Sequence, residues 1–211
     1  MNKKIKLIAF DLDGVLVDSK GGWKEVHNGL GTANAAKPHE KLFYRGEITF
    51  DEWALMDVEL WKGRSIDRIK EILDEIPPMK GASYAIPKLG ENYILAIISG
   101  GLKLLADRIK DNYGFHYAIG NALKVNGGKV TGISQSVGFN DKGKILRQVA
   151  EDEGVDLKEC AAVGDYINDI PMFKLAGFSI AFNPKHEDIV DYADEVVMEK
   201  DLTKILRFFD R

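Results

Sequence analysis

The first hydrophobic stretch of the chain, residues 5–10, is rich in Ile, Leu and Phe and ends at two carboxylates, Asp11 and Asp13. A short apolar run that stops at a polar turn is typical of a buried parallel strand. In open α/β sheets, chemistry takes place just beyond the carboxyl ends of the strands. The pattern therefore predicts that Asp11 and Asp13 lie together at the edge of a sheet, with Gly14 allowing the chain to bend.

Between residues 19 and 76 the pattern changes to helical periodicity, without a convincing buried strand. Residues 50–61 carry apolar side chains at i, i+3 and i+4 spacing behind Thr49, which we expect to be an N-cap. Ser65 is expected to cap the next helix, and two prolines end the block at residues 77–78. A helical block inserted after the first strand predicts a cap domain, residues 19–76.

After this block, helical and extended patterns alternate. Helices are predicted at 83–90, 103–112, 144–154, 168–176 and 202–209, strands at 93–98, 161–165, 178–182 and 195–198, and a hairpin within 117–137 around Asn126-Gly127-Gly128. Strands separated by helices imply a doubly wound, parallel, Rossmann-like sheet. The predicted fold is therefore an α/β core, residues 1–18 and 77–211, with a small helical cap and a β-hairpin insertion.

Composition narrows the function only by exclusion. The chain has 211 residues, 45% of them hydrophobic and 29% charged, and a net charge of -4, which gives no electrostatic case for binding nucleic acid or an anionic membrane. The single cysteine, Cys160, rules out an intrachain disulfide and is expected to be buried. Without a signal peptide or a transmembrane-length run, we expect a cytoplasmic protein, a monomer or a homodimer.

Two further places put phosphate-binding groups next to the predicted sheet. Ser99 is followed by Gly100 and Gly101 at the end of a strand, where backbone N–H groups can approach an oxyanion closely. Lys142 precedes a predicted helix and can neutralise a phosphate. Taken alone, the first is more often a simple loop and the second a solvated lysine.

A fourth place follows the strand 161–165. Asp165 ends that strand, and Asn168 and Asp169 come three and four residues later, which places them above it on a helical turn. Oxygen ligands here, close to Asp11, would hold a hard cation such as Mg²⁺. The alternative, that these side chains are plain N-caps, loses weight because polar groups that converge on one pocket mark a functional site.

The four places together, in this order, resemble the haloacid dehalogenase-like hydrolase superfamily and, within it, the phosphoserine phosphatase branch. The resemblance rests on the segments FDLDGVLVD, IISGG, NDKGKIL and VGDYINDIPMF, and it extends over essentially the whole chain. It implies hydrolysis of a small phosphorylated metabolite in two steps. Asp11 would attack phosphorus to form an aspartyl-phosphate, and Asp13 would protonate the leaving group and then activate water.

The resemblance also implies the other roles. Mg²⁺ would be held by the Asp11 carboxylate, the Asp13 backbone carbonyl and Asp165, with Asp169 fixing Lys142 or a metal-bound water. The phosphoryl oxygens would be bound by Ser99, Gly100, Lys142 and Asn168.

In the cap, the charges that the resemblance implies for phosphoserine are reversed. The acid expected to bind the substrate amine falls at Lys20, and the arginine expected to bind the carboxylate falls at Asp57. Like charges at a binding site cost several kcal/mol. The substrate is then either phosphoserine in a rearranged cap, with Glu25, Arg45 or Arg64 compensating, or a different small phosphate monoester. Candidates for recognising it are Lys20, Trp23, Phe50, Trp53 and Asp57.

Other functions remain open on the same fold. A phosphotransferase or phosphomutase would pass the phosphoryl group from Asp11 to an acceptor other than water, and a non-catalytic protein would only bind a phosphometabolite. The presence of every acid and of the lysine argues against the non-catalytic protein. Asp13 argues against dehalogenation, because a halide leaving group needs no acid.

Overall fold

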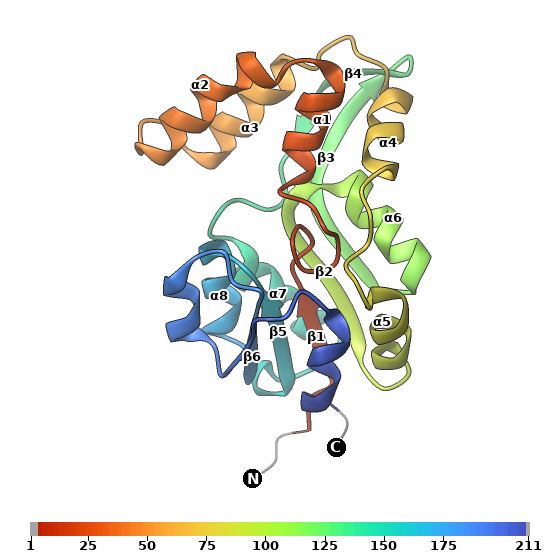
Figure 1. Ribbon diagram of the computed structural model, residues 1–211, viewed down its shortest axis with the longest axis vertical. Coiled ribbons are helices and arrows are strands. Elements are labelled where there is room, and N and C mark those ends of the chain that lie inside the picture. The colour runs from red at the N-terminus through yellow and green to blue at the C-terminus, as the bar shows by residue number, and fades with distance from the viewer. Residues whose placement is uncertain (1–3, 210–211) are drawn as a thin grey trace.

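The computed structural model describes residues 4–209 and forms one seven-stranded sheet with helices on both faces and a helical region beyond its edge (Figure 1). Residues 1–3 and 210–211, which belong to the predicted core, lie outside the described part. The strand order is β4-β3-β2-β1-β5-β6-β7. All neighbouring strands are parallel except β3 and β4, which form the antiparallel hairpin. The predicted α/β class, the parallel sheet and the hairpin are confirmed.

The bounds of the elements follow the predicted alternation. The strands are β1 (Leu7–Phe10), β2 (Ile94–Leu102), β3 (Tyr117–Asn126), β4 (Lys129–Ser134), β5 (Cys160–Gly164), β6 (Phe178–Phe182) and β7 (Glu195–Val197). The helices are α1 (Gly22–Leu30), α2 (Ala33–Tyr44), α3 (Phe50–Glu59), α4 (Ile66–Asp74), α5 (Ala82–Gly90), α6 (Lys103–Tyr113), α7 (Lys142–Asp152) and α8 (Ile170–Phe173). Short 3₁₀ segments occupy Leu157–Glu159, Ile167–Asp169, Glu187–Tyr192 and Leu202–Phe208.

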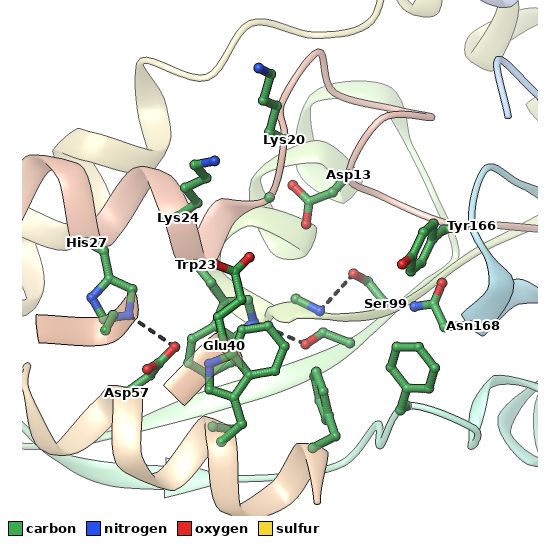
Figure 2. A pocket seen from close by; sticks show the side chains of 18 of the residues that line it. Asp13, Lys20, Trp23, Lys24, His27, Glu40, Asp57, Ser99, Tyr166 and Asn168 are labelled. Carbon is green, nitrogen blue, oxygen red and sulfur yellow. Dashed lines mark hydrogen bonds and ion pairs between the residues drawn. The ribbon is translucent and has the colours of Figure 1, made fainter. Parts of the chain in front are cut away.

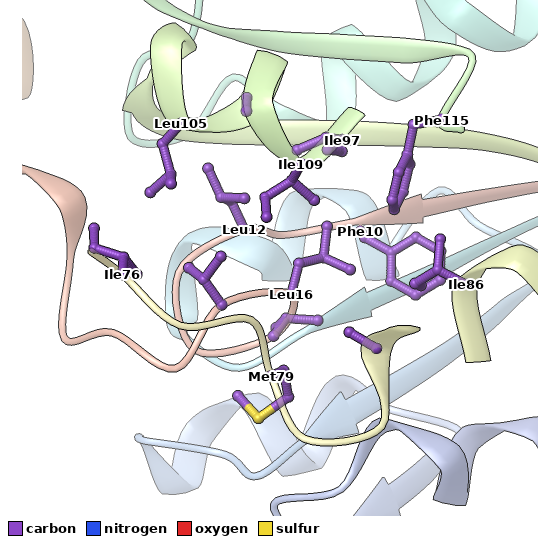
Figure 3. Close-up of a cluster of buried hydrophobic side chains, with 14 of the residues drawn as sticks. Phe10, Leu12, Leu16, Ile76, Met79, Ile86, Ile97, Leu105, Ile109 and Phe115 are labelled. Carbon is purple, nitrogen blue, oxygen red and sulfur yellow. The ribbon is translucent and has the colours of Figure 1, made fainter. Parts of the chain in front are cut away.

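Strand β1 lies at the centre of the sheet and is buried on both faces. Ile8 and Phe10 belong to one hydrophobic cluster and Leu7 and Ala9 to another. The first cluster includes side chains of α5 and α6 (Figure 3), and the second includes side chains of α7 and α8. Because alternate residues of a strand face opposite sides, this division is what a sheet covered by helices on both faces requires.

Three predicted elements differ from the structure. Strand β2 continues through Ser99, Gly100 and Gly101 to Leu102, with an irregular register against β3 after Ile98. The predicted helix 168–176 is shorter, because a 3₁₀ turn precedes α8 and Pro171 lies at its start. The predicted C-terminal helix is a 3₁₀ segment. Glycines and short turns allow local hydrogen bonding that periodicity does not reveal.

The helical region after β1 contains α1 to α4, and its caps are those predicted. The Thr49 side chain accepts from the backbone N–H of Glu52 and completes a capping box, and Ser65 accepts from the N–H of Asp67. The assignment of residues 19–76 to a separate cap domain stays a prediction. Cys160 is buried, as expected. None of the helices within residues 4–209 has the combination of length and hydropathy that a membrane span requires.

The β3–β4 hairpin joins this helical region to the sheet. Val130 of β4 exchanges backbone hydrogen bonds with the segment before α4, donating to the Arg64 carbonyl at 3.0 Å and accepting from the Gly63 N–H at 2.9 Å. The Ile66 N–H donates to the Gly128 carbonyl at 3.0 Å. Helix α4 is thereby tied to the hairpin, whereas α2 and α3 project away from the sheet (Figure 1).

Candidate active site

The carboxyl ends of β1, β2 and β5 open into a pocket of about 690 Å³ that extends toward α1, α2 and α3. Of the predicted site residues, eleven line this pocket: Asp11, Asp13, Lys20, Trp23, Phe50, Trp53, Asp57, Ser99, Gly100, Asp165 and Asn168. The two others, Lys142 and Asp169, are fully buried and lie behind Asp11. The structure therefore brings these residues to one place, and Figure 2 shows the cap candidates Lys20, Trp23 and Asp57 on the same pocket as Asp13 and Ser99.

Asp11 follows β1 directly and is paired with a buried lysine. The Lys142 ammonium lies 2.6 Å from Oδ1 of Asp11 and 2.5 Å from Oδ1 of Asp169. Burial by itself would lower the pKa of Lys142, but the two carboxylates raise it above its ordinary value. Lys142 is the first residue of α7, so its position is fixed by the start of that helix. Asp11 thus faces a buried positive charge.

Asp169 is held on both of its oxygens. Oδ1 contacts Lys142, and Oδ2 accepts the backbone N–H groups of Asp165 at 2.9 Å and of Tyr166 at 3.1 Å. Gly164 makes room for this side chain, because a Cβ on that glycine would lie 2.4 Å from Cγ of Asp169. Burial raises the pKa of Asp169 to about 6, against the opposing effect of Lys142. Asp169 therefore positions Lys142.

Asp13 connects the sheet to the beginning of α1. Its Oδ1 accepts the Gly22 N–H at 3.0 Å. Burial, followed by the nearby charge of Asp11, raises the pKa of Asp13 from 3.8 to about 7. A carboxyl group with such a pKa can exchange a proton near neutral pH, as general acid–base chemistry requires.

Three buried carboxylates, those of Asp11, Asp165 and Asp169, each offer an oxygen within 4.8 Å of the others. Burial and then the charge of Asp11 raise the pKa of Asp165 to about 8, so the negative charge here is incompletely balanced. A donor set made only of oxygens suits a hard divalent cation. The residues present therefore fit a metal site.

Lys185 supplies a positive charge at this same point. Its ammonium lies 2.7 Å from Oδ2 of Asp165 and 3.3 Å from the Asp13 carbonyl oxygen. Gly14 lies alongside with a φ of 90°, and a Cβ there would be 2.1 Å from Oδ2 of Asp165 and 2.2 Å from the ammonium. The bend at Gly14 thus leaves space for a cation between these oxygens.

The sequence interpretation did not find Lys185. A signal was available, since Lys185 follows β6, which neighbours β5, at the edge where polar groups gather. Of the predicted compensating residues, Glu25, Arg45 and Arg64 are absent from the lining of the pocket, whereas Lys24, Lys37 and Glu40 are part of it.

The phosphate-binding segment is held from two sides. The Ser99 hydroxyl oxygen accepts the Gly101 N–H at 2.9 Å, and the Gly100 carbonyl accepts from Asn121 at 3.0 Å and from the Trp23 indole at 3.2 Å. Trp23 belongs to α1, so the helical region contacts the segment directly. Asn168 lines the pocket with an amide oxygen that has no hydrogen-bond partner in the described structure.

A sheet with carboxylates beyond β1 and β5, a buried lysine and a Ser-Gly-Gly segment at the end of β2 defines an enzyme built for phosphoryl chemistry. Comparison with known families agrees, since a model of the haloacid dehalogenase-like hydrolases matches residues 5–177. The chain belongs to this family. Within it the chain is phosphoserine phosphatase-like, a phosphoric monoester hydrolase.

Individual relatives place the chain more closely. It is 36% identical over 211 residues to phosphoserine phosphatase of Methanocaldococcus jannaschii, with 99% of each chain covered. Phosphoserine phosphatase of Archaeoglobus fulgidus is 33% identical over 95% of this chain and 59% of the relative. Two solved phosphoserine phosphatases, one with a phospho-aspartyl intermediate analogue and one with bound substrate, superpose with a TM-score of 0.85. Their sequence identities are 35% and 34%, and each comparison covers 98% of this chain and 99% of the other.

Proposed function

We propose that this protein hydrolyses a small phosphate monoester with Asp11 as the nucleophile and Asp13 as the general acid and base. The observation that carries the proposal is the buried contact of Lys142 with Asp11 at the floor of the pocket. The lysine holds the Asp11 carboxylate in place, and its charge favours the approach of a phosphate dianion to a carboxylate.

In this proposal, Asp11 attacks phosphorus on the side opposite the ester oxygen, and the P–O ester bond breaks. Asp13 donates its proton to the departing alkoxide. The same carboxylate then takes a proton from a water molecule that attacks phosphorus and releases Asp11. The raised pKa of Asp13 supports both roles, because the group holds its proton close to neutral pH.

The phosphoryl oxygens are proposed to meet Ser99, the Gly100 backbone, Lys142 and Asn168. The Ser99 hydroxyl accepts from Gly101, which leaves its own proton available for a phosphoryl oxygen. Asn168 is a pocket residue whose side-chain amide also supplies donors. These donors oppose the charge that develops on the transferred group.

Mg²⁺ is the proposed cofactor, held by the Asp11 and Asp165 carboxylates and the Asp13 backbone carbonyl. When bound, it would neutralise charge on the phosphoryl group. Asp169 would act from behind, since both of its oxygens already hold Lys142 and the backbone. A cytoplasmic location and a monomeric or homodimeric state stay predictions from the sequence.

Phosphoserine is the first substrate to test, because relatives named phosphoserine phosphatase match over the full length of the chain. Phosphate release is measured with Mg²⁺ and with EDTA, for the unmodified protein, Asp11→Asn and Asp18→Asn. The last is the matched control, a surface aspartate on the same segment that pairs with Lys200.

The proposal expects Mg²⁺-dependent release that is lost in Asp11→Asn and kept in Asp18→Asn. Undiminished release from Asp11→Asn would overturn it. Release that requires an added alcohol acceptor would instead identify a phosphotransferase.

A further inference from the structure

The part of the pocket that is lined by residues of the helical region carries an unusual distribution of charge. Its cations are Lys20 just before α1, Lys24 on α1 and Lys37 on α2, and its acids are Glu40 on α2 and Asp57 on α3. A pocket of about 690 Å³ has room for more than a phosphoryl group, so these side chains face the remainder of the substrate.

Lys20 and Lys24 are exposed, and neither makes an ion pair or a hydrogen bond with any residue in the range 4–209. They lie four residues apart, on the side of the pocket that also holds Asp13 (Figure 2). Lys37, by contrast, donates to Oδ1 of Asn34 at 3.0 Å. Two neighbouring like charges without an acidic partner repel each other, and a bound anion would relieve that repulsion.

Asp57 does not supply the missing partner. It is buried, with its Oδ1 2.7 Å from Nδ1 of His39 and its Oδ2 3.1 Å from Nε2 of His27. His27 is oriented in turn by the Trp61 indole, which donates to its Nδ1 at 3.1 Å. Both oxygens of Asp57 are therefore engaged inside the helical region, and the carboxylate is not available to a substrate ammonium.

Glu40 is the acid of this region that remains available. It is exposed, lines the pocket and has no ion pair among the described residues. Figure 2 shows Glu40 beside Trp23 and apart from Lys20 and Lys24, so the cations and the acid lie at different positions. A substrate that carries both an acidic group and an ammonium can place each of them next to a side chain of opposite charge.

We propose that Lys20 and Lys24 form a subsite for a second acidic group of the substrate, a carboxylate in the case of phosphoserine, and that Glu40 receives an ammonium when the substrate carries one. The inference rests on the proposed phosphatase function. It reverses the polarity that the family resemblance implies, with cations on α1 where an acid was expected.

Three esters separate the two charges: O-phosphoserine carries both, phospholactate carries only the carboxylate, and O-phosphoethanolamine carries only the ammonium. Binding is measured with Asp11→Asn protein, which cannot form the aspartyl-phosphate, from the fluorescence of the tryptophans in the pocket wall. Steady-state kinetics on the protein with Asp11 intact follow. The test variant is Lys20→Gln/Lys24→Gln, and Lys37→Gln is the matched control on the same pocket.

The double variant is expected to weaken binding of phosphoserine and phospholactate by roughly tenfold, as for the loss of a charge-assisted hydrogen bond, with little change in kcat. Phosphoethanolamine should bind as before, and Lys37→Gln should behave as the unmodified protein. Glu40→Gln should weaken phosphoserine and phosphoethanolamine but not phospholactate.

Equal effects on all three esters, or none, would overturn the subsite. If p-nitrophenyl phosphate and all three esters fail to release phosphate, the proposed function itself fails, and the subsite with it. Release of phosphate without any dependence on the substrate carboxylate overturns the subsite alone.

Discussion

The Lys185 ammonium lies 2.7 Å from Oδ2 of Asp165 and also contacts the Asp13 carbonyl oxygen. These are two of the oxygens proposed to bind Mg²⁺, so a lysine and a divalent cation compete for one position. Two positive charges that close repel each other strongly. Binding of the metal therefore requires the lysine side chain, which is 38% exposed, to turn toward solvent.

Lys185→Met is accordingly expected to bind Mg²⁺ more tightly, by roughly tenfold, which corresponds to about 1.4 kcal/mol. In EDTA the same variant should melt at a lower temperature, because Asp165 loses its counter-charge. Isothermal titration calorimetry and thermal unfolding measure the two effects. Lys144→Met, an exposed lysine of α7 outside the pocket, is the control. Unchanged Mg²⁺ affinity would show that the lysine does not compete.

The raised pKa of Asp13 predicts that the folded protein loses stability as pH rises. Its pKa is about 7 in the folded protein and 3.8 as the ordinary value. Between these values the folded protein keeps a proton that the unfolded chain has released, so the free energy of unfolding falls as pH rises. The side chain of Asp13→Asn cannot ionise, so this variant should lack the decrease in the free energy of unfolding.

In EDTA, Asp13→Asn should therefore be more stable than the unmodified protein at about pH 8, by as much as about 4 kcal/mol. The difference should shrink toward about pH 4, where both states of the unmodified protein hold the proton. Urea denaturation across this range measures it. A difference that does not vary with pH would mean that Asp13 is ionised in the folded protein throughout.

Removal of the buried lysine should be costly. Lys142→Met leaves the carboxylates of Asp11 and Asp169 facing each other without a cation, and the free energy of unfolding should fall by about 3–5 kcal/mol. Adding Asp169→Asn removes one of the stranded charges and should recover part of that loss. A double-mutant cycle in chemical denaturation provides the measurement, and simple additivity would contradict the coupling.

The contact between Trp23 and Gly100 should matter for turnover more than for stability. Trp23→Phe removes the indole N–H that donates to the Gly100 carbonyl but keeps a ring against Trp61, 5.2 Å away between centroids. The value of kcat/KM should fall roughly five- to tenfold, about 1 kcal/mol for one hydrogen bond, with an unchanged melting temperature.

The control is Trp53→Phe, because the Trp53 indole N–H has no hydrogen-bond partner in the described structure. Trp53→Phe should leave kcat/KM near that of the unmodified protein. Equal losses in both variants would point to the aromatic wall instead of the hydrogen bond.

The chemistry of the site was predictable from the sequence because buried strands are recognisable as short apolar runs. Asp11 and Asp165 each end an apolar run, and a parallel sheet brings such ends together. Helical spacing placed Asp169 near Asp165, although its contact with Lys142 needed the direction in which α7 starts. The part of the pocket at the ends of β1 and β5 was thus predictable from the strand pattern.

Recognition in the helical region was less predictable for a physical reason. Side chains such as Lys24 and Glu40 come from helices whose packing angles depend on tertiary contacts, so spacing along the chain does not tell which side faces the pocket. Lys185 was missed because it lies in an irregular segment without periodicity. Asp57 lines the pocket as predicted, but its pairing with two histidines could not be read from the sequence.

The hairpin ties α4 to the sheet through backbone hydrogen bonds, whereas Phe43 of α2 and Phe50 of α3 pack against Phe139 and the Gln135 side chain donates to the Asp51 carbonyl. The residues proposed to select the substrate belong to this helical region, which can vary with little cost to the residues proposed to break the ester bond. In such an architecture the specificity of an enzyme can diverge by a few charge substitutions while its reaction stays the same. Phosphatases with different substrates can then evolve while they keep the same sheet.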